Sequence, residues 1–84
     1  MSEYDPLVKF EVDHRVDARG LVCPEPLMLL QQVVSKAHSG ERVLLLATDQ
    51  TTERDVVHFC HFLGHTLKEQ LTEGELYFFV VEKH

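Results

Sequence analysis

Cys23 is the residue with the clearest capacity for chemistry, because it stands between a short polar approach and an amphipathic segment, in the run DARGLVCPEP at residues 17–26. Pro24 disfavours helical backbone at Cys23, while its own fixed φ suits the first position of a helix. Cys23 is therefore predicted to be the N-cap. There the helix dipole and free backbone N–H groups would stabilise a thiolate, so the pattern predicts a nucleophilic sulfur of lowered pKa.

The residues after Cys23 define the start of this helix and a small pocket for an anion. Pro26 lacks an N–H, which leaves Glu25 and Leu27 as nearby backbone donors. The charge of Glu25 suits the helix dipole but would repel a thiolate, so we expect its side chain to point outward. Arg19 could partly offset that charge. Cysteine is a poor N-cap for stability, which favours a functional reason for its presence.

Length and charge exclude several classes of protein. At 84 residues the chain is expected to form one domain with a simple core. Its net charge of −6 opposes an extended phosphate-binding surface, so direct RNA binding is not expected to be the main role. No secretory signal and no apolar run of transmembrane length can be read, which predicts a cytoplasmic protein.

Apolar periodicity predicts an α+β fold. Leu27, Leu30, Val33, Val34 and Ala37 recur at helical spacing, and the Ser39-Gly40 pair closes that helix. Strands are predicted at residues 14–18, 43–47, 66–71 and 76–81, and a second helix at residues 53–63, capped by Thr51 or Thr52 and ended by Gly64. The order β-α-β-α-β-β predicts a two-layer sandwich, with a four-stranded mixed sheet and both helices on one face. Residues 1–13 are expected to be a loosely ordered leader before a single domain over residues 14–84.

The second cysteine has a structural interpretation. Val56, Cys60 and Leu63 fall on one side of the second predicted helix, beside Phe59, so Cys60 is expected to be buried and unreactive. Because the two cysteines are 37 positions apart and neither belongs to a C-x-x-C pair, no disulfide is expected, and a reducing compartment is the default.

A different class of function is metal binding. His58, His61 and His65 are spaced i, i+3 and i+7, so three imidazoles could share an exposed face and hold zinc or copper. His65 lies at or beyond the predicted helix end, and no carboxylate is clearly placed among the three. A solvated histidine face is therefore the preferred interpretation, and no metal or organic cofactor is expected.

Together these segments resemble the TusA/SirA family of small sulfur carriers. The resemblance runs from about Asp17 to the last strand, and its signature is the Cys-Pro-x-Pro motif Cys23-Pro24-Glu25-Pro26 at a helix start. Supporting blocks are Asp17-Ala18-Arg19-Gly20, Ala47-Thr48-Asp49, Thr52-Glu53-Arg54-Asp55 and the segment FCHFLGH at residues 59–65.

The resemblance implies that Cys23 carries sulfur as a persulfide, making the protein a sulfurtransferase in that limited sense. It further implies a cysteine desulfurase as donor and another sulfur-relay protein as acceptor, leading to 2-thiouridine in tRNA, which would be only an indirect partner. A sulfur exposed to protein partners is expected, with Arg19 and the off-stripe Met28 as candidate contacts. The alternatives are the metal site and a regulatory module of the same fold that does not use the thiol.

Overall fold

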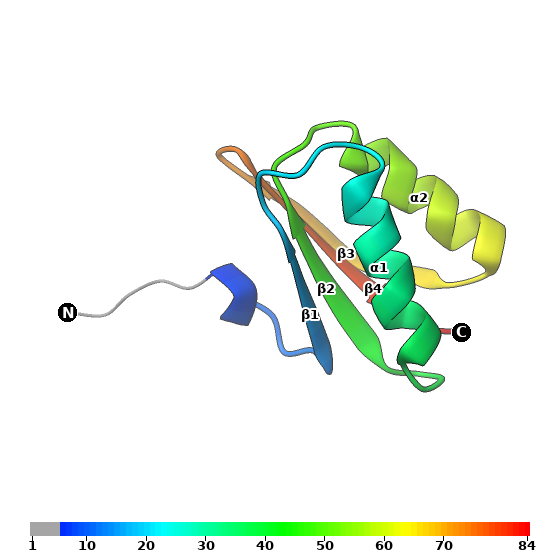
Figure 1. Ribbon diagram of the computed structural model, residues 1–84. Helices are drawn as coiled ribbons and strands as arrows, with labels where there is room; N and C mark the ends of the chain where they lie inside the picture. Colours follow the sequence, from blue (N-terminus) through cyan, green and yellow to red (C-terminus); the bar gives the residue numbers. More distant parts are fainter. Residues whose placement is uncertain (1–5) are drawn as a thin grey trace.

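The computed structural model describes residues 6–84, which form a short 3-10 helix, four strands and two α-helices (Figure 1). In chain order these are η1 (Pro6–Val8), β1 (His14–Ala18), α1 (Glu25–Lys36), β2 (Arg42–Ala47), α2 (Thr52–Leu63), β3 (Thr66–Glu73) and β4 (Leu76–Glu82). The predicted β-α-β-α-β-β order is confirmed.

The four strands form one mixed sheet in the order β1-β2-β4-β3. β1 runs parallel to β2, with Val16 beside Leu45, whereas β4 is antiparallel to both of its neighbours. The central position of β2 explains its apolar sequence, because Val43 to Ala47 are buried throughout. Both helices cover the same face of the sheet (Figure 1), as the pattern predicts.

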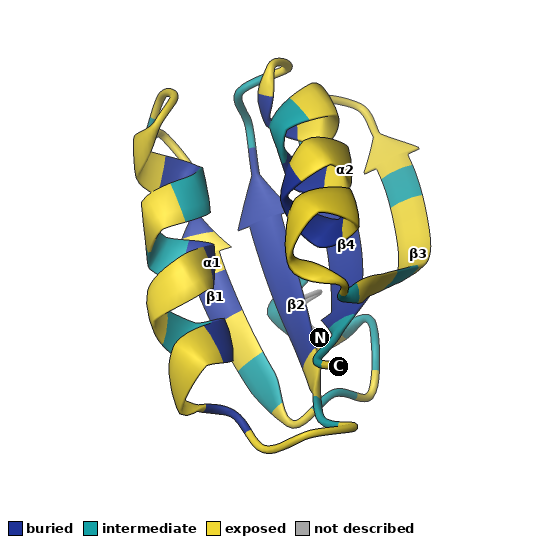
Figure 2. Cartoon of the chain, turned by 90° about the vertical axis from the view of Figure 1, so that its right-hand side faces the viewer, coloured by how far each residue is buried: buried dark blue, intermediate teal, exposed yellow. Residues whose placement is uncertain are grey.

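The sheet separates two apolar clusters, one on each of its faces. Figure 2 shows that the central strand β2 is buried along most of its length. Leu30 and Val34 of α1 and Val56 and Phe59 of α2 pack on the helix side. On the other face, Leu44, Leu46, Phe78 and Val80 are covered by partly buried side chains that include Leu7, Phe10 and Val12. The described part of the expected leader thus packs on the sheet, while residues 1–5 lie outside the described range.

Helix boundaries differ from the sequence-based prediction at three ends. The N-cap position of α1 is Pro24, and α1 ends at Lys36, because the extended backbone of Ala37 turns the chain before Ser39. Thr51 occupies the N-cap position of α2, yet neither candidate threonine caps that helix with its hydroxyl. The C-terminal prediction for α2 is confirmed, since Gly64 has the left-handed φ of +80° that favours glycine.

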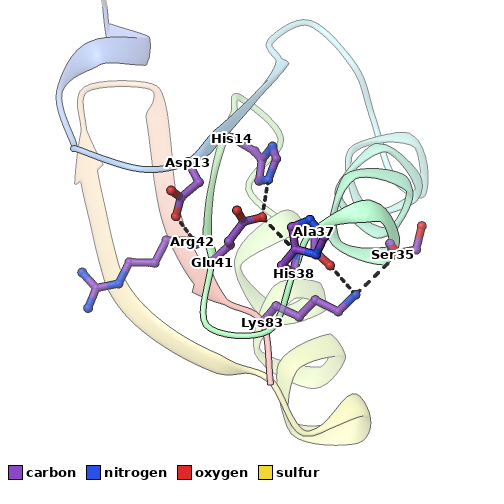
Figure 3. Close-up of polar contacts among 8 residues, drawn as sticks. All are labelled: Asp13, His14, Ser35, Ala37, His38, Glu41, Arg42 and Lys83. Carbon is purple, nitrogen blue, oxygen red and sulfur yellow. Dashed lines mark hydrogen bonds and ion pairs between the residues drawn. The ribbon is translucent and has the colours of Figure 1, made fainter.

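A polar cluster closes the end of the sandwich where α1 finishes (Figure 3). Glu41 Oε1 lies 2.8 Å from His14 Nε2 and also accepts the His38 N–H. Lys83 Nζ donates to the Ala37 carbonyl at 2.8 Å, where a cation complements the negative end of the helix dipole. These contacts connect β1, the α1–β2 loop and the C-terminal segment. The loop that carries Cys23 lies at the opposite end of the sandwich (Figure 1).

Candidate functional site

Two loops meet at the end of the sheet where the parallel strands β1 and β2 finish (Figure 1). The loop after β1 carries Cys23, and the loop after β2 carries Thr48 and Asp49. The Gly20 N–H donates to Thr48 Oγ1 at 2.9 Å, and the Cys23 N–H donates to Asp49 Oδ2 at 2.7 Å. Parallel strands therefore bring together two loops that are far apart in the sequence, and the second loop fixes the backbone of the cysteine.

Asp49 organises this junction through both of its carboxylate oxygens. Besides the Cys23 N–H at Oδ2, it accepts the N–H and the hydroxyl of Thr51 at Oδ1, each at 3.0 Å. The Cys23 N–H is the largest of the causes that lower the pKa of Asp49 below its ordinary value, followed by the N–H and hydroxyl of Thr51. Asp49 is therefore a carboxylate that joins the two loops.

The prediction that Cys23 caps α1 is wrong, because the cysteine lies one residue outside the cap. The Pro24 carbonyl accepts the Met28 N–H at 3.0 Å, as the N-cap carbonyl of a helix does. The Glu25 N–H, expected to face the sulfur, instead donates to the Val22 carbonyl at 2.9 Å. The first turn of α1 thus gives the sulfur fewer donors than the sequence suggested.

The side chain of Cys23 instead contacts a carboxylate on the other helix. Its thiol donates to Asp55 Oδ2, with Sγ and the oxygen 3.1 Å apart. This hydrogen bond raises the pKa of Cys23 above its ordinary value, and the charges of Asp55 and Asp49 act in the same direction. The predicted lowering of the pKa of Cys23 is therefore wrong in sign: the resting sulfur is a protonated thiol.

Asp49 and Asp55 are the residues of the site that sequence reasoning missed. Both stand in blocks that carry the family resemblance, but an acid in the first turn of a helix, such as Asp55, is also accounted for by the helix dipole alone. The available signal is their position after β2: Asp49 lies in the loop that follows this strand, and Asp55 lies in the first turn of α2. Because β1 and β2 run parallel, the loops that follow them lie at the same end of the sheet, which brings both acids close to the cysteine loop.

Comparisons with known proteins identify the family. The family model "Sulfurtransferase TusA" matches residues 14–83. This chain belongs to the TusA family. It is 44% identical over 84 residues to the sulfur carrier protein TusA of Pseudomonas syringae pv. syringae (strain B728a), an alignment covering 99% of this chain and 98% of the relative. The crystal structure of a SirA-like protein from Desulfitobacterium hafniense has the same fold, with a TM-score of 0.74 at 18% identity over 83% of this chain and 96% of that one.

Only one of the two cysteines in this TusA-family chain is open to a partner. Cys23 is exposed, whereas Cys60 is 4% exposed and packs in the helix-side cluster with Val56 and Phe59. Burial raises the pKa of Cys60 to about 11. The prediction that Cys60 is a buried thiol is confirmed.

The two candidate contact residues have different surroundings. Arg19 forms a two-pronged pair with Asp17, donating from Nε at 2.9 Å and from Nη2 at 2.7 Å. Its guanidinium charge therefore pairs with the carboxylate of Asp17. Met28 lies in the first turns of α1 with 56% of its surface exposed, and Val22, next to the cysteine, is 65% exposed. Exposed apolar side chains thus stand just before the cysteine and in the first turns of the helix that follows it.

The three histidines do not assemble into a metal site. His58 and His61 are exposed on α2, whereas the ring of His65 lies 5.6 Å from that of Phe59. His65 Nδ1 also accepts the His84 N–H at 3.1 Å. Across residues 6–84, no group of three or more His, Cys, Asp or Glu side chains is arranged to hold a metal ion.

A groove of about 610 Å³ runs beside the site between the two helices. Asp55 lies at this groove, while Cys23 is outside it. The groove is lined by Leu27, Gln31, Asp55, His58, Phe59, His61, Phe62 and Leu63, and Phe62 is 87% exposed.

None of the described helices is long and apolar enough to cross a membrane.

Proposed function

We propose that this protein carries sulfur as a persulfide on Cys23, taking it from a cysteine desulfurase and passing it to a downstream sulfur-relay protein. The observation that carries the proposal is the exposure of Cys23 in a chain of a sulfur-carrier family whose other cysteine, Cys60, is buried. Val22, next to Cys23 in the chain, and Met28, in the first turns of α1, supply exposed apolar surface, which suits contact with a protein partner.

The reaction is a thiol exchange at the terminal sulfur of the donor persulfide. The Cys23 sulfur, as thiolate, attacks that atom, and a new S–S bond forms as the donor's S–S bond breaks. The donor cysteine leaves as a thiolate and takes up a proton, so one proton is lost by Cys23 and one is gained by the donor. The acceptor later removes the sulfur atom in the same way and restores the thiol, and no external oxidant or reductant enters either step.

The proposed end product is 2-thiouridine in tRNA, with the tRNA contacted by other proteins of the relay in the cytoplasm. The curated relative is named a sulfur carrier protein, which supports the carrier step. The net charge of −6 supports protein partners in preference to direct tRNA contact, because nonspecific affinity for nucleic acid depends on clustered Lys and Arg.

Intact-mass spectrometry after incubation with a cysteine desulfurase and free cysteine tests this proposal. The wild type and Cys60→Ala should gain the mass of one sulfur atom, which reductant removes, and Cys23→Ser should gain none. Circular dichroism of Cys23→Ser checks that the variant is folded. Loading of Cys23→Ser would contradict the proposal, and a folded Cys23→Ser that supports normal thiolation in the cell would instead favour a module that does not use the thiol.

A further inference from the structure

The resting site does not present the reactive form of its own cysteine. Sulfur exchange requires a thiolate, yet the Cys23 thiol donates its proton to Asp55 Oδ2 at 3.1 Å. The Asp55 side chain is only 22% exposed, so water screens its charge less than it would at an open surface. Ionisation of Cys23 would place two negative charges in contact.

The charged groups that act on Cys23 come from two segments, and the effect of the two negative groups exceeds that of the one positive group. Asp49, in the loop after β2, and Asp55, on α2, both favour the protonated thiol. Arg54 opposes them, but its Nε lies 3.9 Å from Asp55 Oδ1 and its side chain is 72% exposed. A pair of this length and exposure neutralises Asp55 weakly, so the balance at the sulfur favours the thiol.

We propose that Asp55 holds the unloaded Cys23 as a neutral thiol, and that a basic side chain of a docked sulfur donor pairs with Asp55 and thereby releases the thiolate. The inference rests on the proposed function, because it concerns the loading of Cys23. A basic donor surface also complements the net charge of −6 of this chain. Reactivity is then confined to the complex, where Asp55 has a better partner than the thiol.

The proton balance of the loading step follows. When the cation pairs with Asp55, the thiol loses its acceptor and the charge that opposed ionisation, and its proton passes to water. The thiolate attacks the terminal persulfide sulfur, and the donor cysteine takes up one proton as it leaves. In the free protein the same thiol stays protonated, which slows its reaction with other electrophiles.

The pH dependence of alkylation by iodoacetamide, an uncharged probe, tests whether Asp55 holds the unloaded Cys23 as a neutral thiol. Asp55→Asn should lower the apparent pKa of Cys23 and raise the alkylation rate at pH 7. Each unit by which the pKa falls increases the thiolate fraction about tenfold at a pH below the pKa. A more acidic thiolate is also about threefold less nucleophilic per unit, so the net increase in alkylation rate is about threefold per unit. Glu53→Gln is the matched control, because Glu53 lies on the same helix turn but bonds to Gln70 at 2.8 Å.

The rate of loading by a cysteine desulfurase tests whether a basic side chain of the donor pairs with Asp55. Asp55→Asn should be loaded more slowly than wild type although its free thiol reacts faster, because the donor's cation has lost its pair. Asp55→Ser provides a second variant, and thermal unfolding checks that both are folded. An alkylation rate no higher than wild type, or desulfurase loading as fast as wild type, would overturn the role of Asp55. Loading of Cys23→Ser would instead overturn the proposed function itself.

Discussion

The two thiols of this chain are both harder to ionise than an ordinary cysteine, for opposite physical reasons. Cys23 is exposed, and its pKa is raised by a hydrogen bond to Asp55. Cys60 is 4% exposed, and its pKa is raised to about 11 by burial among apolar side chains. A partner that removes a charge can reverse the first effect on docking, whereas the second persists until the fold opens.

The largest expected difference between the two thiols is kinetic. In the native protein at pH 7.5, iodoacetamide should modify Cys23 at least about a hundredfold faster than Cys60, because Cys60 reacts only when α2 opens. In denaturant the two rates should become equal within about twofold. Mass mapping of both peptides over time measures this, and comparable native rates would show that Cys60 is not protected.

Substitution of the two cysteines should affect the free energy of unfolding unequally, with the larger loss at the buried Cys60. Cys60→Ser places a hydroxyl in the helix-side cluster and should cost about 1–3 kcal/mol in the free energy of unfolding. Cys23→Ser changes an exposed side chain and should cost no more than about 0.5 kcal/mol. Urea unfolding of both variants checks the contrast, which would fail if Cys23→Ser were the more damaging change.

Alkaline pH should weaken the fold through Cys60. The pKa of Cys60 is about 11 in the folded protein and 9.0 ordinarily, so the folded state holds this proton more tightly than the unfolded state does. The resulting contribution to the free energy of unfolding is fully present below pH 9 and is lost as pH rises through about 11. Two pKa units at about 1.4 kcal/mol each set the upper limit of the loss in unfolding free energy at about 3 kcal/mol. Unfolding of wild type and Cys60→Ala at several pH values measures it, and an equal loss in both would assign it to other groups.

The smallest effect concerns Asp49. Its pKa is lowered in the fold, so the loop contact it makes is kept until pH falls below the ordinary value of 3.8. The amide resonance of Cys23, which donates to Asp49, should shift with that protonation, while the amide of Cys60 should not. An NMR titration checks this, and a Cys23 amide that shifts near pH 5 would contradict the contact.

The fold and the fate of Cys60 were predictable because both depend on local periodicity. Five consecutive apolar residues mark β2, and the helical spacing of Val56 and Cys60 places the second thiol inside. The end of α1 was less predictable, because Ala37 is apolar and continues the helical spacing although its backbone is extended.

The ionisation state of Cys23 could not be predicted from its own helix. The dipole of α1 lies next to Cys23 in the chain, but the largest effect on the pKa of Cys23 comes from Asp55, 32 positions away on α2. Pro24 also occupies the N-cap position predicted for Cys23, so the cysteine lies one residue before the cap. The contact depends on the crossing of two loops, so it becomes visible only once the parallel pairing of β1 and β2 is known.

Direct titration of both thiols, by NMR of their labelled Cβ carbons, tests most directly the claim that a carboxylate holds the exposed cysteine protonated at rest. We expect a Cys23 pKa above the ordinary value that falls in Asp55→Asn, and a Cys60 pKa of about 11 that does not change in that variant. A Cys23 pKa below the ordinary value in the wild type would show that Asp55 does not hold the thiol protonated and would favour activation of Cys23 by the dipole of α1.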